Sequence, residues 1–152
     1  MLATVRVVLI DLDGVLYVED EPIAGARDAV ERLRAAGLAL RFVTNTTARS
    51  WSHTFQKLER LGFDAGKEEL VTPAALAVAH CARHELRRVA LVMNAEVKRD
   101  FAGLEEADDA QAVIVGDLGD AFGYDVLKPS LSPGRCRGRA DRPAEESVLA
   151  AG

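Results

Sequence analysis

Residues 5–14 read VRVVLIDLDG, an apolar run rich in β-branched residues that stops at two aspartates and a glycine. Such a run is typical of a parallel strand that is covered on both faces. It is far too short to span a bilayer, and it ends in acidic residues instead of the small-residue cleavage site of a signal peptide. We therefore predict a buried strand over Val5–Ile10 that delivers Asp11 and Asp13 to one edge of a sheet.

The segments that follow alternate between helical and strand patterns. Residues 23–36 place apolar side chains at helical spacing, residues 38–43 form a second apolar run, and residues 50–61 form a second helix with a serine as its N-cap. The second apolar run ends in Thr44 and Asn45. This order predicts an α/β fold with a parallel sheet, right-handed crossovers and a ligand site beyond the carboxyl ends of the strands.

The pattern becomes weaker toward the end of the chain. A helix is expected over residues 73–83, and strands are expected over residues 88–93 and 112–115. From residue 128 onward, three of the five prolines and several glycines and arginines replace any apolar periodicity. Because such a composition cannot bury much apolar surface, we expect residues 128–152 to be mostly unstructured.

The composition is that of one globular domain: 152 residues, of which 49% are hydrophobic and 28% charged. The formal net charge of -5 gives no electrostatic reason to expect a nucleic-acid partner, since binders of the phosphate backbone usually carry a basic patch. No membrane partner is expected either. The two cysteines, Cys81 and Cys136, have neither disulfide-framework nor zinc-site spacing, so a reducing, cytoplasmic setting is the expectation.

The D-L-D-G stretch places two carboxylates close together at the end of a strand. Paired carboxylates repel each other, and a hard cation between them relieves the repulsion; Mg²⁺ suits this role because it takes oxygen ligands and retains waters. The same tetrapeptide is also an ordinary solvated strand-to-turn junction, since Asp and Gly are the commonest turn residues. The tetrapeptide alone leaves both interpretations open.

The surrounding residues carry a family resemblance. The stretch VVLIDLDGVLYVEDEPIAGA (residues 7–26) resembles the first motif of the haloacid dehalogenase superfamily, and LRFVTNTT (residues 40–47) resembles its second motif. The segment VIVGDLGDAFGYDVL (residues 113–127) looks like part of the large C2-type cap of its subfamily IIA. That subfamily includes nitrophenylphosphatase-like enzymes, pyridoxal phosphatase and phospholysine phosphohistidine inorganic pyrophosphate phosphatase. The resemblance extends over about residues 5–127.

The resemblance implies a Mg²⁺-dependent phosphatase that works through an aspartyl phosphate. Asp11 would attack the phosphorus, and Asp13 would act as general acid and then as general base. Thr44 and Asn45 would contact the phosphoryl oxygens. The Asp11 carboxylate and the Asp13 backbone carbonyl would hold the Mg²⁺ ion.

Two further parts of the family's machinery, a lysine in a G-K-P motif and a second acidic motif, are not found in the expected context. Lys128 is followed by Pro and Ser but lacks the preceding strand and glycine, and Asp117 lacks the expected acidic neighbour, so the cap interpretation of its segment is favoured. By resemblance, residues 1–86 would be the N-terminal part of the core, 87–127 a partial cap, and 128–152 a non-homologous tail of a C-terminally truncated chain.

These observations lead to two hypotheses of different classes. The first is a phosphatase of small phosphate esters or phospho-amino acids, whose activity in this form is weak or absent. The second is a non-catalytic fragment that acts as an interaction module through its exposed strands or its cap surface. A small phosphorylated substrate is the expected partner, and the cap surface is the expected site of any homo-oligomer.

Overall fold

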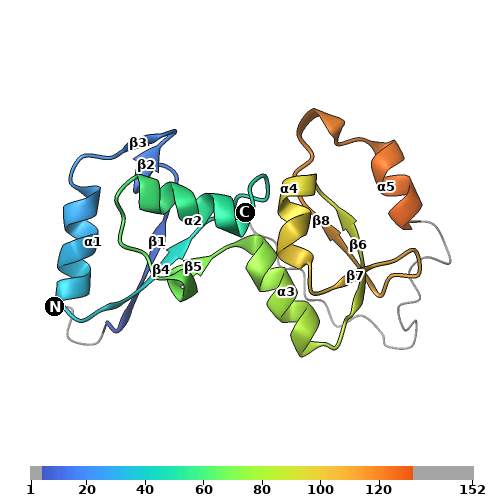
Figure 1. Ribbon diagram of the computed structural model, residues 1–152, viewed down its shortest axis with the longest axis horizontal. Coiled ribbons are helices and arrows are strands. Elements are labelled where there is room, and N and C mark those ends of the chain that lie inside the picture. The colour runs from blue at the N-terminus through green and yellow to red at the C-terminus, as the bar shows by residue number, and fades with distance from the viewer. Residues whose placement is uncertain (1–4, 132–152) are drawn as a thin grey trace.

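Two parallel β-sheets lie side by side in the computed structural model, which describes residues 5–131 (Figure 1). The first sheet has the strand order β1-β4-β5 and the second has the order β7-β6-β8. The strands of the first are β1 (Val7–Asp11), β4 (Ala39–Val43) and β5 (Leu70–Val71); those of the second are β6 (Arg88–Val92), β7 (Glu105–Glu106) and β8 (Ala112–Val115). The predicted α/β class with parallel strands is confirmed.

The remaining elements connect these strands. A short antiparallel hairpin of β2 (Tyr17–Val18) and β3 (Glu21–Pro22) follows β1. The helices are α1 (Ala26–Ala35), α2 (Trp51–Arg60), α3 (Pro73–Arg83), α4 (Ala95–Lys98) and α5 (Tyr124–Leu131), and 3-10 turns cover Lys67–Glu69, Arg99–Phe101 and Gly119–Ala121. None of the helices described between residues 5 and 131 is long and apolar enough to cross a membrane.

The first sheet is covered on one face. Val8 and Ile10 of β1 pair in register with Leu40 and Phe42 of β4, and these four side chains join the core cluster to which α1 and α2 contribute. The opposite face is open: Leu9 is 71% exposed. The prediction of a strand covered on both faces is therefore wrong for the described residues. The order β1-β4-β5 explains this, because right-handed crossovers that move in one direction along a sheet place their helices on the same face.

The start of α2 is fixed by its cap. The Ser50 hydroxyl accepts a hydrogen bond from the His53 backbone N–H at 3.2 Å, as the predicted N-cap requires. Gly62 follows the helix with a φ of +77°, a left-handed conformation in which glycine is not strained. Within the helix, the Trp51 and Phe55 rings stack with their centroids 4.9 Å apart, and both side chains pack in the core cluster of the first sheet.

The second sheet has its own apolar cluster, to which α3 and α4 contribute Cys81 and Val97. The Thr72 hydroxyl caps α3 by accepting from the Ala75 N–H at 3.2 Å. Cys81 is a buried free thiol whose pKa is raised by burial. Helix α3 already packs into the cluster of the second sheet, although it precedes the domain boundary proposed between residues 86 and 87. That boundary stays a prediction.

The end of the described chain differs from the sequence-based expectation. Helix α5 runs through Leu131, so residues 128–131, the start of the stretch expected to be mostly unstructured, are helical. Composition indicates how much apolar surface a segment can bury, but one turn of backbone hydrogen bonds can continue a helix that begins upstream at Tyr124. Residues 132–152, including Cys136, lie outside the described residues.

Candidate active site

Asp11 is the last residue of β1, and its register places it beside the second motif. It lies opposite Val43 of β4, and Thr44 is the next residue along that strand's direction. With strands about 4.8 Å apart and a rise of about 3.3 Å per residue, the Cα atoms of Asp11 and Thr44 lie roughly 6 Å apart. The two motifs therefore meet at the carboxyl ends of neighbouring parallel strands, as the alternation of elements predicted.

The D-L-D-G stretch folds around its buried leucine. Leu12 is 0% exposed, whereas the flanking Asp11 and Asp13 side chains are exposed. The chain then turns: Gly14 has a φ of +78° and its N–H donates to the Tyr17 carbonyl at 2.8 Å. Such a left-handed conformation suits glycine because a side chain would be strained there. The buried leucine and this turn together leave both carboxylates facing solvent at the sheet edge.

Thr44 is buried, and both its backbone N–H and its side-chain hydroxyl form hydrogen bonds. Its backbone N–H donates to the Val71 carbonyl at 3.2 Å, and its hydroxyl accepts from the Thr46 N–H at 3.2 Å. A hydroxyl that accepts one hydrogen bond still has its own proton to donate, so Thr44 can also donate to a phosphoryl oxygen. Asn45, the next residue, is exposed. The pair thus combines a fixed hydroxyl with a solvent-facing amide.

The pKa of Tyr17 is affected by burial and by the charges of the two carboxylates. Burial raises its pKa to about 12, and the negative charges of Asp13 and Asp11 add to the effect. The Lys57 ammonium of α2 lies 4.2 Å from the centroid of the Tyr17 ring, a cation–π contact. This contact brings a positive charge from α2 toward the acidic edge of the sheet.

A cleft of about 430 Å³ lies next to Asp13 and is lined by charged side chains that the sequence motifs did not indicate. Besides Asp13, Tyr17 and Thr46, its lining includes basic residues on or just before α2, namely Arg49, His53, Lys57 and Arg60. Their spacing of four and three residues places them on one helix face. That spacing is present in the sequence, but it matches none of the motifs that carried the resemblance.

The described residues offer a metal ion only part of a binding set. No group of three or more histidine, cysteine, aspartate or glutamate residues gathers within residues 5–131. Asp11 and Asp13 contribute oxygen ligands of the kind that Mg²⁺ prefers, and the rest of its octahedral shell would have to come from waters and phosphate oxygens. Lys128 lies in α5, which contacts β6 of the second sheet. Asp117 follows β8 in that sheet, and the cap interpretation of its segment stays a prediction.

Comparison with known proteins identifies the family. The model of the haloacid dehalogenase-like hydrolases matches residues 8–105, which is more than half of the chain. The chain belongs to this family. Asp11, Asp13, Thr44 and Asn45 all lie within the matched residues.

Among curated relatives, human haloacid dehalogenase-like hydrolase domain-containing protein 2 is 36% identical over 126 residues, covering 83% of this chain and 48% of that protein. The phospholysine phosphohistidine inorganic pyrophosphate phosphatase of Xenopus laevis is 39% identical over 125 residues, covering 79% and 46%. This member of the haloacid dehalogenase-like family therefore spans about half the length of the curated relatives it matches.

Solved structures show the same fold. A glycerol phosphate phosphatase from Mycobacterium tuberculosis, crystallised in complex with magnesium, superposes with a TM-score of 0.67 at 30% identity, covering 84% of this chain and 40% of that one. A 4-nitrophenylphosphatase from Thermotoga maritima superposes with a TM-score of 0.72 at 23% identity, covering 83% and 49%. The second likeness concerns the fold alone.

Proposed function

We propose that the chain supplies the nucleophile and the phosphate-contacting loop of a Mg²⁺-dependent phosphatase that acts on small phosphate esters or phospho-amino acids. The observation that carries this proposal is the register of β1 and β4, which brings Asp11 beside Thr44 at one edge of the first sheet. Names of relatives support it at the level of substrate class, since they include a glycerol phosphate phosphatase and a phospholysine phosphohistidine inorganic pyrophosphate phosphatase.

The proposed reaction has two displacements. The Asp11 carboxylate attacks the phosphorus and forms an aspartyl phosphate, while the leaving oxygen takes a proton from Asp13. Asp13 then removes a proton from the water that attacks the phosphorus, and the Asp11 carboxylate leaves. Thr44 donates its hydroxyl proton to a phosphoryl oxygen, and the exposed Asn45 amide is placed to do the same. When bound by Asp11 and the Asp13 carbonyl, Mg²⁺ neutralises charge on the transferring group.

Turnover of p-nitrophenyl phosphate in the presence of MgCl₂ tests the proposal. We expect slow turnover by the isolated chain, because no lysine is assigned to the phosphate and no second acidic motif completes the metal site. Asp11→Asn should abolish this turnover, since the amide keeps the size of the side chain but removes the nucleophilic charge. Asp28→Asn, an exposed aspartate in the first turn of α1, is the matched control and should leave turnover unchanged. Fast turnover by the wild-type chain would show that Lys128 or Asp117 supplies the missing groups.

A second candidate function rests on the open face and edge of β1. Val7 and Leu9 are 50% and 71% exposed, and β1 is the terminal strand of its sheet among the described residues. An exposed apolar strand edge is a template for pairing with another chain. The chain could therefore act without catalysis, as an interaction module. Two results together would favour this candidate: the wild-type chain shows no turnover, and its association with another chain is unchanged in Asp11→Asn.

A further inference from the structure

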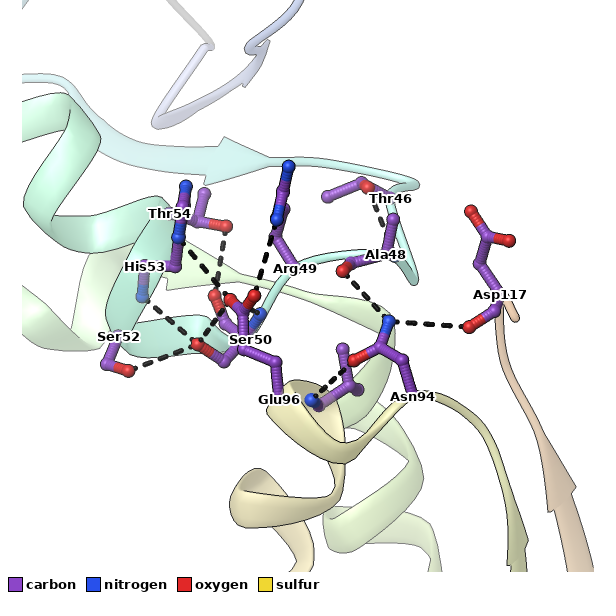
Figure 2. Close-up of polar contacts among 11 residues, drawn as sticks. Thr46, Ala48, Arg49, Ser50, Ser52, His53, Thr54, Asn94, Glu96 and Asp117 are labelled. Carbon is purple, nitrogen blue, oxygen red and sulfur yellow. Dashed lines mark hydrogen bonds and ion pairs between the residues drawn. The ribbon is translucent and has the colours of Figure 1, made fainter. Parts of the chain in front are cut away.

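The second-sheet unit reaches back to the start of α2, close to the second motif (Figure 2). Glu96 of α4 accepts hydrogen bonds from the Ser50 backbone N–H at 3.0 Å and from the Ser50 hydroxyl at 3.1 Å. Asp100 accepts from the Trp51 backbone N–H at 2.7 Å. The first N–H groups of a helix have no partner within the helix, so these carboxylates satisfy donors that would otherwise lack one.

Glu96 takes the place of a residue that α2 lacks. In a capping box, a Glu or Gln at the third helical position returns to the backbone N–H of the N-cap residue. In α2 that third position is His53, which cannot accept in the same way as a carboxylate does. The missing acceptor comes instead from Glu96, 46 residues further along the chain. Two parts of the molecule, separate in sequence, thus complete one helix cap.

The loop between Thr44 and Ser50 forms further hydrogen bonds with the second-sheet unit, besides those of the helix cap. The Asn94 amide donates to the Ala48 carbonyl at 3.0 Å, and the Thr47 hydroxyl accepts from the Asp117 N–H at 3.1 Å. Upstream, the Thr46 hydroxyl accepts from the Ala48 N–H at 3.3 Å. One side of the loop is therefore tied to the second sheet, while its other end carries Thr44 beside Asp11.

The charges agree with this arrangement. Hydrogen bonding from the Ser50 N–H, above all, lowers the pKa of Glu96, and the charge of His53 and a hydrogen bond from Arg49 act in the same direction. His53 Nδ1 lies 3.4 Å from the Glu96 carboxylate, as does one guanidinium nitrogen of Arg49. An ionised carboxylate at a helix N-terminus is favoured by the helix dipole. Glu96 therefore serves the cap in its charged form.

We propose that Glu96, assisted by Asp100, is a positioning residue for the phosphate-contacting loop: from the second sheet it completes the cap of α2 and so fixes the loop that carries Thr44. This inference deepens the proposed function and rests on it for the identity of the ligand. It also means that displacement of the second-sheet unit from α2 would loosen the loop, so the two sheets cooperate in binding a phosphoryl group.

Amide hydrogen exchange and phosphate titration, both followed by NMR on the full chain, test the inference. Glu96→Ala should speed exchange at the Ser50 amide by roughly tenfold, the size expected for loss of a helix cap. The same variant should weaken the binding of inorganic phosphate, in the presence of MgCl₂, by a similar factor. Glu96→Gln keeps an acceptor oxygen and should restore part of both effects. Glu106→Ala is the control, because this carboxylate of the same unit forms its ion pair with Lys98 and not with the start of α2.

The outcomes separate this inference from the proposed function. Unchanged exchange at Ser50 in Glu96→Ala would overturn the cap, and faster exchange with unchanged phosphate affinity would overturn the positioning role. Phosphate binding that is absent in the wild-type chain would overturn the proposed function. In that case faster exchange in Glu96→Ala would still establish the cap, but only as a structural contact.

Discussion

Leu12 separates the two carboxylates to which the proposed function assigns one phosphoryl group. Because it is completely buried, the residues on either side of it are turned outward at the end of β1. A single apolar side chain between two aspartates thus controls where both carboxylates point. Replacing it would therefore disturb the proposed nucleophile and the proposed acid together.

Thr44 provides a residue-scale prediction. Thr44→Val keeps the shape of the side chain but removes the hydroxyl that is expected to donate to the phosphoryl group. If the proposed function is right, kcat/KM for p-nitrophenyl phosphate should fall by about 10²-fold, as when one preorganised donor is removed. Thr44→Ser keeps the hydroxyl and should retain most of the activity. Equal losses in the two variants would show that the methyl group, not the hydroxyl, is what the site requires.

The sequence predicted the acidic half of the candidate site better than its basic half. Asp11 and Thr44 end apolar strands, and their placement follows from the topology of a parallel sheet. Lys57 could not be assigned in the same way, because its approach to Tyr17 depends on how α2 packs across the hairpin. Glu96 was also missed, since its partner Ser50 lies 46 residues away and no local pattern links them.

At the scale of elements, the pairing of Arg34 with Glu69 joins the end of α1 to the segment before β5. Two guanidinium nitrogens contact the two carboxylate oxygens at 2.9 and 2.8 Å, and the Gly66 N–H adds a further hydrogen bond at 2.8 Å. Glu69 is 9% exposed, so removing its charge leaves Arg34 without its partner in a partly buried place. We expect Glu69→Gln to lower the free energy of unfolding by about 1–3 kcal/mol at pH 7, measured by urea denaturation.

The same pair predicts a pH dependence. Hydrogen bonding from Arg34, above all, lowers the pKa of Glu69, so the folded state binds a proton less readily than the unfolded state. The stabilisation is then fully present above the unfolded pKa of about 4.3 and is lost as the pH falls through the folded pKa. Urea denaturation between pH 7 and pH 3 should show this loss in the wild-type chain and less of it in Glu69→Gln. Parallel curves for the two proteins would contradict the assignment.

Long elements were predictable and short ones were not. Helix α3 begins and ends where its alanine-rich pattern predicted, and strand β8 does the same. In contrast, strands β2, β5 and β7 contain two residues each, too few for any periodicity to appear. They form because a neighbouring strand or turn offers backbone partners, and this information is absent from the local sequence.

At the scale of the whole molecule, the first sheet has one face covered by helices and one face exposed to solvent. If the open face and edge of β1 mediate association, Leu9→Lys should reduce that association while leaving stability within about 0.5 kcal/mol, because Leu9 is mostly exposed. Sedimentation velocity and thermal unfolding give the two readouts. Ile10→Ala, on the buried face, should instead cost about 2–4 kcal/mol. Association that persists unchanged in Leu9→Lys would locate the contact elsewhere, for example on the cap surface proposed for homo-oligomers.

The chain spans about half the length of the curated relatives it matches, so the decisive test concerns the chemical role of Asp11 and not the rate of turnover. The most direct measurement is to quench the chain with acid during incubation with p-nitrophenyl phosphate and MgCl₂, and to locate any phosphoryl adduct by mass spectrometry. We predict an adduct on the peptide that contains Asp11, removable by hydroxylamine and absent from Asp11→Asn. An adduct on another residue, or turnover that survives Asp11→Asn, would contradict the assignment of Asp11 as the nucleophile.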